Sequence, residues 1–250
     1  MRTVAIIPAR YASSRFPGKP LVDIEGKSMI RRVYERVHRA ALIDEVIVAT
    51  DDERIAGHVR TFGGRVRLTR ADHRSGTDRC AEVAAELNGV DFVVNVQGDE
   101  PFIDPAQIDQ VIRPLQAKKA AIATLARRIE KHEELFSPHA VKVVFAPGGR
   151  ALYFSRSPIP FRRDVPQAAW AEAPLYYKHI GLYGFSLPAL LAVTRLAPSR
   201  YEEAESLEQL RWLEGGYAIH VELTEIETPG IDTPEDLARL LKKETPSGNH

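Results

Sequence analysis

The residues with the clearest capacity for chemistry are two adjacent acids, Asp99 and Glu100, which follow a short apolar segment over residues 92–96. The β-branched composition of that segment is typical of a buried central strand. Ligands of open α/β sheets bind just beyond the carboxyl ends of the strands, and a carboxylate there suits Mg²⁺. The stretch by itself also fits a solvated turn, bent at Gly98, in which both acids face water.

A second charged group lies in the polar segment after the first predicted strand, residues 3–8. Arg10, Arg15 and Lys19 fall close together there, with Gly18 and two serines among them. Cations and backbone N–H groups crowded at the carboxyl end of a strand favour a polyphosphate site over a solvated basic loop. The segment has neither the spacing of a Walker loop nor the G-x-G-x-x-G pattern of a dinucleotide-binding turn.

Two further polar stretches are weak signals when taken alone. Ser75-Gly-Thr-Asp-Arg79 starts a predicted helix, where free N–H groups can receive a nucleotide, although a plain helix cap explains the stretch equally well. Asp232 precedes the last predicted helix and could join Asp99 at a shared metal pair that neutralises a triphosphate. A capping or turn aspartate is the alternative for Asp232.

A third set of polar residues suits an acidic, hydroxylated substrate. His179 and Tyr183 fall at positions that a strand points to one face. Arg156 and the pair Glu208-Gln209 could line a polar pocket with them, because an arginine binds a carboxylate through two N–H groups. Each of these residues alone has a structural explanation, so the prediction depends on their meeting in space.

Strand-like and helix-like segments alternate along the chain, which predicts an α/β fold with a mostly parallel sheet. Strands are expected at residues 3–8, 46–50, 66–69, 92–96 and 218–224. Helices are expected at residues 28–42, 77–87, 105–116, 188–196 and 201–213, and a last one starts at Thr233. The 250 residues are therefore expected to form one domain, 1–250, that ends in a polar tail over 244–250.

Between about residues 120 and 185 the pattern changes to short strands, at 121–125, 141–145, 151–154 and 180–185. Gly148-Gly149 predicts a hairpin turn among them. A proline-rich excursion over 157–174 follows the hairpin. Exposed strands with such an excursion favour a dimerisation surface over a plain surface loop, so we expect a homodimer.

The composition restricts the partners. Lys and Arg together number 34, as do Asp and Glu, so no global charge favours nucleic acid or an anionic membrane. The single cysteine, Cys80, excludes an internal disulfide framework and fits a reducing compartment, where it is expected to be a small apolar residue of a helix. The chain enters a strand at once, and no apolar run approaches the roughly 20 residues that span a bilayer. We expect a cytoplasmic protein.

Short stretches spread in order from the first strand to the last helix carry a resemblance to a known family. They are Ile7-Pro-Ala-Arg-Tyr-Ala-Ser-Ser-Arg-Phe-Pro-Gly-Lys-Pro-Leu21, Val48-Ala-Thr-Asp51, Ser75-Gly-Thr-Asp-Arg79, Val96-Gln-Gly-Asp-Glu-Pro101, Ala151-Leu-Tyr-Phe-Ser-Arg-Ser-Pro-Ile-Pro160, His179-Ile-Gly-Leu-Tyr183, Glu205-Ser-Leu-Glu-Gln-Leu-Arg211 and Gly230-Ile-Asp-Thr-Pro-Glu-Asp-Leu237. Together they resemble the 3-deoxy-manno-octulosonate (Kdo) cytidylyltransferases, a family of sugar nucleotidyltransferases. The first stretch is shared widely among such enzymes, whereas the fourth, fifth and seventh together are highly specific.

The resemblance implies a Rossmann-like, mostly parallel sheet flanked by helices, with a smaller strand-rich part, about 120–185, for dimerisation and sugar binding. It implies transfer of CMP from CTP to Kdo, giving CMP-Kdo and pyrophosphate for lipopolysaccharide synthesis. Mg²⁺ is the implied cofactor. The implied mechanism is direct displacement at the α-phosphorus of CTP by the anomeric hydroxyl of the sugar.

The matching stretches also imply roles for individual residues. The nucleotide would be bound by Pro8, Ala9, Arg10, Ser13, Arg15, Lys19, Ser75, Gly76, Thr77, Arg79 and Gln97. The sugar acid would be bound by Gln97, Arg156, His179, Tyr183, Glu208 and Gln209. Mg²⁺ would be bound by Asp99 and Asp232, which would carry catalysis together with Lys19 and Arg15.

One stretch departs from the family. Where its members usually read Pro-Ser-Pro-Leu-Glu, this chain reads Pro198-Ser-Arg-Tyr-Glu202, beside the implied sugar pocket. The alternatives are therefore a cytidylyltransferase for another acidic sugar, 8-amino-Kdo or a sialic acid, and a nucleotide-binding protein without catalysis. The presence of Asp99, Asp232 and Lys19 argues against the last, because a protein that only binds nucleotide needs no complete metal pair.

Overall fold

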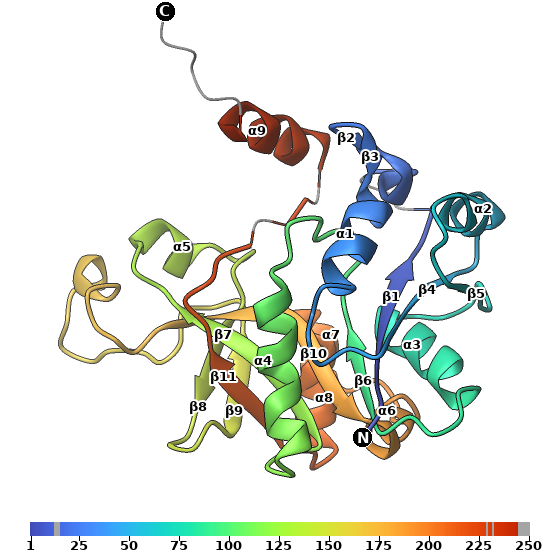
Figure 1. Cartoon of the computed structure of the whole chain (residues 1–250). Coiled ribbons are helices and arrows are strands. Elements are labelled where there is room, and N and C mark those ends of the chain that lie inside the picture. Colours follow the sequence, from blue (N-terminus) through green and yellow to red (C-terminus); the bar gives the residue numbers. More distant parts are fainter. Residues whose placement is uncertain (13–15, 229, 232, 245–250) are drawn as a thin grey trace, which may run out of the picture.

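A single large sheet organises the molecule. The computed structural model describes residues 1–12, 16–228, 230–231 and 233–244. Within these residues nine strands form a sheet in the order β11-β7-β10-β6-β1-β4-β5, with β8 and β9 attached at β10 (Figure 1). The strands are β1 (Thr3–Ala9), β4 (Glu45–Thr50), β5 (Val66–Leu68), β6 (Phe92–Asn95), β7 (Ile122–Arg128), β8 (Lys142–Phe145), β9 (Ala151–Ser155), β10 (Tyr177–Ser186) and β11 (Ile219–Leu223). The predicted α/β fold with a mostly parallel central sheet is confirmed.

Strand direction divides the sheet into two regions. On one side β1 runs parallel to β4 and β6, and β5 runs parallel to β4. On the other side β10 runs antiparallel to β6 and to β7. Because β1, β4 and β6 are parallel, the loops that follow them emerge at one edge of the sheet, where ligands of α/β folds bind.

Side chains of β1 alternate between two cores, one on each face of the sheet. Val4 and Ile6 pack into the core beside α3 (Gly76–Ala85), α6 (Leu187–Val193) and α8 (Glu208–Glu214). The next residues of the strand, Ala5 and Ile7, pack into the core beside α1 (Met29–Val37), α2 (Glu53–Thr61) and α4 (Pro105–Gln116). This period of two is the signature of a strand buried on both faces.

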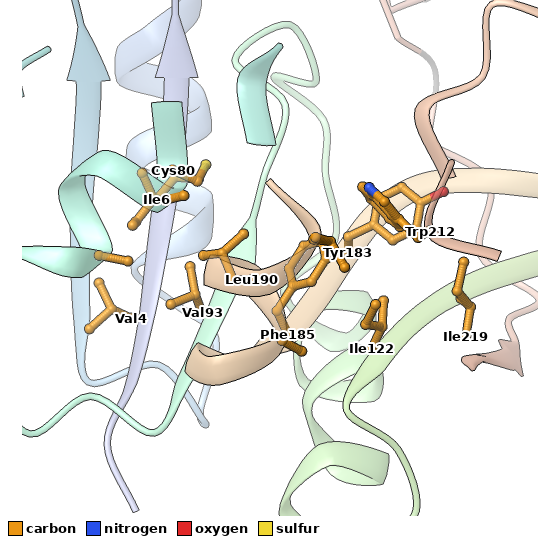
Figure 2. Close-up of a cluster of buried hydrophobic side chains, with 14 of the residues drawn as sticks. Val4, Ile6, Cys80, Val93, Ile122, Tyr183, Phe185, Leu190, Trp212 and Ile219 are labelled. Carbon is orange, nitrogen blue, oxygen red and sulfur yellow. The ribbon is translucent and has the colours of Figure 1, made fainter. Parts of the chain in front are cut away.

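The first core extends from aliphatic side chains on β1 to aromatic side chains on β10 and α8, as Figure 2 shows. Cys80 lies fully buried in this core, and burial raises the pKa of its thiol well above the usual value. It is therefore a small apolar residue of α3, as predicted, and not a nucleophile.

The predicted helix over residues 201–213 is wrong as a single element. The structure has α7 (Arg200–Glu205) and α8 instead, separated by Ser206, whose φ of 50° lies in the left-handed region and ends the first helix. Because of this break, Glu208 is the first residue of α8. Three short elements were not predicted, because they are too short to produce a period: β2 (Asp23–Ile24), β3 (Lys27–Ser28) and α5 (His132–Phe136).

The strand-rich part is mostly continuous with the main sheet, since β7 and β10 lie within it. The predicted hairpin is confirmed: β8 and β9 pair across a turn in which Gly148 and Gly149 have positive φ. The proline-rich excursion packs Trp170 against Leu135 and Tyr176 in a small core of its own. The last helix is α9 (Pro234–Glu244), and no helix in the described part of the chain has the length and apolar character that crossing a bilayer requires.

Candidate active site

A cavity of about 300 Å³ opens at the edge of the sheet where β1 and β6 end. It is lined by Pro8, Ala9, Arg10, Lys19, Pro20, Arg74, Ser75, Gly76, Gln97, Gly98 and Asp99. The loop after β1, the loop after β6 and the start of α3 therefore meet at one place, although they are far apart in the sequence. Most of the residues predicted to bind a nucleotide line this cavity.

Glycines let these three segments approach closely. A Cβ atom on Gly98 would lie 2.8 Å from the carbonyl oxygen of Pro8, and one on Gly76 would lie 3.0 Å from the Pro8 ring. No side chain fits at the first of these contacts. The wall of the cavity is thus largely backbone there, which leaves room for a ligand to approach main-chain N–H groups.

An ion pair joins the two loops. The Lys19 ammonium lies 2.7 Å from the Asp99 carboxylate, and the lysine side chain is only 10% exposed whereas that of Asp99 is 39% exposed. Lys19 begins a short 3-10 turn (Lys19–Leu21) after Gly18, which has a φ of 72°. The pair places a cation and an anion side by side in the cavity.

The segment before the last helix reaches the same place. The Ile231 N–H donates to the main-chain carbonyl of Asp99 at 3.2 Å. Position 231 therefore lies against Asp99, and its neighbour Asp232, predicted to share the metal, lies outside the described residues. Ser13 and Arg15 of the first loop lie outside them as well, so their predicted roles stay predictions.

The donor set fits the implied cofactor. The Asp99 carboxylate offers hard oxygen ligands, and Mg²⁺ is usually held by one or two such carboxylates together with substrate phosphates. Within the described residues no group of three or more His, Cys, Asp or Glu side chains is arranged to hold a metal ion by itself. Of the two adjacent acids, only Asp99 lines the cavity, while burial and the nearby Asp99 raise the pKa of Glu100 to about 7.

The start of α3 connects the predicted nucleotide and sugar residues directly. Ser75 caps the helix and closes a capping box with Asp78. The hydroxyls of Ser75 and Thr77 also donate to the two oxygens of the Glu208 carboxylate, at 2.9 and 2.8 Å. Arg211 donates to the same carboxylate at 3.0 Å. Burial raises the pKa of Glu208, although these hydrogen bonds oppose the shift.

Arg79 behaves differently from the other predicted nucleotide residues. Its side chain is 0% exposed and lies 3.4 Å from the Asp51 carboxylate. It also donates a hydrogen bond to Thr69. Burial lowers the pKa of the guanidinium, and Asp51 opposes that shift. The structure thus shows Arg79 in a buried ion pair and not in the lining of the cavity, and its contact with a nucleotide stays a prediction.

The predicted sugar residues His179 and Tyr183 meet on one face of β10, with ring centroids 5.3 Å apart. Desolvation lowers the pKa of His179 to about 3, so its ring is neutral at physiological pH, and its Nε2 lies 2.9 Å from the Thr124 hydroxyl. The Tyr183 hydroxyl is buried without a hydrogen-bond partner among the described residues. Such a group is costly unless a ligand or water completes it.

The Arg156 guanidinium donates hydrogen bonds to three main-chain carbonyls through some of its N–H groups. Nε donates to the Glu205 carbonyl at 2.7 Å, Nη1 to the Pro138 carbonyl at 3.0 Å and Nη2 to the Ser206 carbonyl at 3.3 Å. An arginine has five N–H groups, so one remains on each Nη. Two N–H groups side by side form the fork that matches a carboxylate. Gln209, also predicted for the sugar, is 5% exposed on α8 next to Glu208.

Sequence reasoning missed two residues of this region. Arg74 lines the cavity beside Ser75, and Asn95, at the end of β6, donates to the Thr77 hydroxyl at 3.3 Å. A polar residue closing an otherwise apolar strand was a signal for Asn95. Arg74 gave none, because a lone arginine in a polar loop is common.

Comparison with known proteins agrees with this geometry. Residues 4–222 match the family model described as cytidylyltransferase. The 3-deoxy-manno-octulosonate cytidylyltransferase of Syntrophobacter fumaroxidans is 56% identical over 244 residues, covering 96% of each chain. That of Geobacter metallireducens is 53% identical over 249 residues, covering 97% of this chain and 98% of the relative.

Solved structures agree as well. The structure of CMP:2-keto-3-deoxy-manno-octonic acid synthetase complexed with CTP has a TM-score of 0.90 and 43% identity, covering 97% of this chain and 98% of the other. The 4-diphosphocytidyl-2C-methyl-D-erythritol synthase of Anaerococcus prevotii, 18% identical and covering 97% of each chain with a TM-score of 0.62, shares the fold.

The family model and the close relatives identify the chain as a nucleotidyltransferase, and the cavity at the parallel-sheet edge fits that class. The chain belongs to the cytidylyltransferase family, and within it to the 3-deoxy-manno-octulosonate cytidylyltransferases. The resemblance noted in the sequence is thereby confirmed.

Proposed function

We propose that the protein transfers the cytidylyl group of CTP to the sugar acid Kdo and releases pyrophosphate. The observation that carries the proposal is the cavity lined by the Lys19–Asp99 pair and the start of α3, where Ser75 and Thr77 donate hydrogen bonds to Glu208. The names of the relatives and the CTP complex of the similar structure support the two substrates. The product would feed lipopolysaccharide synthesis.

In the proposed reaction the anomeric hydroxyl oxygen of the sugar forms a bond to the α-phosphorus of CTP. The bond from that phosphorus to the pyrophosphate oxygen breaks, and the hydroxyl proton is lost to water. Lys19 and Arg10 line the cavity and would attract the triphosphate. Asp99 and Asp232 are the residues proposed to hold Mg²⁺, which when bound would neutralise charge on the triphosphate.

The acceptor would be oriented from the other side. Arg156 would bind the sugar carboxylate through its two remaining N–H groups. The neutral His179 ring and the buried Tyr183 hydroxyl would pair with sugar hydroxyls, since neither carries charge there. Glu208 accepts from Ser75 and Thr77 of the nucleotide set and would orient the sugar toward the α-phosphate.

We also infer that the enzyme works in the cytoplasm as a homodimer. A reduced, buried cysteine and a nucleotide substrate support the compartment. Large apolar side chains stay exposed near the β8–β9 hairpin and the excursion, at 50% for Leu152, 74% for Phe161 and 42% for Tyr201. Sedimentation of the purified protein tests the dimer, and a monomer at micromolar concentration would contradict it.

The test of the proposed function is Mg²⁺-dependent release of pyrophosphate from CTP, with Kdo, 8-amino-Kdo and a sialic acid compared in parallel. We expect release with Kdo. Release with another sugar acid alone would keep the nucleotide site but contradict the acceptor. The absence of release with all three would favour a protein that binds nucleotide without catalysis.

A further inference from the structure

Lys142, at the start of β8, is a fully buried cation that the proposed reaction does not use. Its side chain is 0% exposed. The ammonium donates to three main-chain carbonyls, those of Ser137 at 2.9 Å, Ala140 at 2.5 Å and Arg156. Within the described residues no carboxylate lies within ion-pairing distance of Lys142. Burying a charge in this way is costly, and an apolar side chain would fill the space at less cost.

The three carbonyls belong to the two segments that hold Arg156. Ser137 and Ala140 lie on either side of Pro138, whose carbonyl accepts from the Arg156 guanidinium. The third carbonyl is that of Arg156 itself. Lys142 and the Arg156 guanidinium thus both donate to main-chain carbonyls of the 137–140 loop, Lys142 with its buried ammonium.

Glu205 also holds the main chain at Arg156. Its carboxylate accepts from the Ser155 hydroxyl at 2.6 Å and from the Arg156 N–H at 2.9 Å. Its carbonyl accepts from Arg156 Nε. Both main-chain polar groups of Arg156 therefore have a charged partner, Glu205 for the N–H and Lys142 for the carbonyl.

The chemistry of the ammonium rules out a direct contact with substrate. A lysine has three N–H donors, and all three are used. Burial lowers the pKa of Lys142 to about 8, Glu205 opposes that shift and Arg156 adds to it, so most of the side chain is charged at neutral pH. The main-chain N–H of His179 donates to the Val141 carbonyl at 2.8 Å. The residue before Lys142 therefore also contacts β10 at a predicted sugar residue.

We propose that Lys142 is a positioning residue that fixes the Arg156 main chain and the 137–140 loop, so that the guanidinium presents its two remaining N–H groups to the acceptor carboxylate. This inference rests on the proposed function in one respect, because it takes the carboxylate of the sugar acid as the ligand of Arg156. The carbonyl partners hold the loop without neutralising the arginine. The positive charge of Arg156 therefore stays available to an anion.

The test uses Lys142→Met, which shortens the side chain by one atom and removes the charge. We expect KM for Kdo to rise at least about tenfold, while KM for CTP stays within about twofold, because loss of order at Arg156 weakens one substrate only. Val143→Ala is the matched control, since Val143 is the next residue of β8 and is also fully buried. It should lower the melting temperature and leave both KM values unchanged.

Hydrogen exchange on the full chain gives a readout that needs no substrate. In Lys142→Met the amides of His139, Ala140 and Arg156 should exchange faster than in the wild type, whereas in Val143→Ala the Arg156 amide should not. Unchanged exchange at Arg156, or equal rises in both KM values, would overturn the proposal. If the wild type does not turn over Kdo, the proposed function fails, while faster exchange at Arg156 in Lys142→Met would still support the positioning role.

Discussion

Lys19 on one side of the site and Arg156 and Lys142 on the other are held in different ways. On the parallel side of the sheet, Lys19 lies against the Asp99 carboxylate. On the antiparallel side, the side chains of Arg156 and Lys142 are held by main-chain carbonyls instead. A carboxylate neutralises its cation, whereas a carbonyl orients the cation and leaves its charge in place.

This difference matches the two proposed ligands. A nucleotide triphosphate arrives with a divalent metal ion, so its site needs both a cation for phosphate and an anion for the metal. A sugar acid brings a single carboxylate, and a guanidinium with free N–H groups suffices to bind it. Variants that affect one side only can therefore separate the two roles.

The largest effect is expected for Asp99→Asn. The substitution keeps the shape but removes the charge that faces Lys19 and the proposed metal, so turnover should fall at least about a thousandfold. Pyrophosphate release from CTP and Kdo measures the change. Asp104→Asn is the control, because Asp104 caps α4 and asparagine caps a helix equally well. Full activity in Asp99→Asn would exclude Asp99 as a metal ligand.

Arg156→Met should come next. The variant loses the two charged N–H groups that would bind the sugar carboxylate. This loss should lower kcat/KM for Kdo about a hundredfold and change KM for CTP by no more than about twofold. Arg162→Met serves as the control, since Arg162 also donates to a carbonyl but within the proline-rich excursion. A rise in KM for CTP as large as that for Kdo would contradict the separation of the two sides.

Glu208→Gln should have a smaller effect that falls on both substrates. The amide has one acceptor oxygen where the carboxylate has two, so the hydroxyls of Ser75 and Thr77 cannot both keep their partner without rearrangement. We expect kcat/KM to fall about tenfold for CTP and for Kdo alike. Glu203→Gln, on the exposed surface of α7, is the control. A change confined to one substrate would show that Glu208 does not link the sites.

The smallest effect concerns pH and the stability of the fold. Because folding lowers the pKa of His179 to about 3, from an ordinary value near 6.5, the unfolded chain binds a proton more readily. The free energy of unfolding therefore falls as pH drops from about 6.5 toward about 3. The slope of this loss against pH corresponds to the uptake of at most one proton on unfolding. Urea unfolding at pH 7.5 and 5 should show a smaller loss in His179→Asn than in the wild type and in the exposed His38→Asn. Equal losses in all three proteins would show that His179 does not titrate in this way.

The parallel side could be predicted from the sequence and the antiparallel side only in part. Lys19 and Asp99 each follow a buried apolar strand, and parallel strands bring their following loops together, so local patterns sufficed. Arg156 follows β9, His179 lies on β10, and Glu208 starts a helix whose position depends on the left-handed Ser206. No local period reveals that break, and the predicted helix ran through it. Residue types and the resemblance singled out these residues. The Lys142 and Glu205 contacts had no sequence signal, because most of them are with main-chain groups, which are invisible in a sequence.

The most direct test of the two-sided site compares Lys19→Met with Arg156→Met in steady-state assays in which CTP and Kdo are varied in turn. We expect Lys19→Met to lower kcat/KM for CTP at least about a hundredfold, and Arg156→Met to raise KM for Kdo with little change in KM for CTP. Two variants that impair the same substrate, or that each impair both equally, would contradict a site divided between the parallel and antiparallel halves of the sheet.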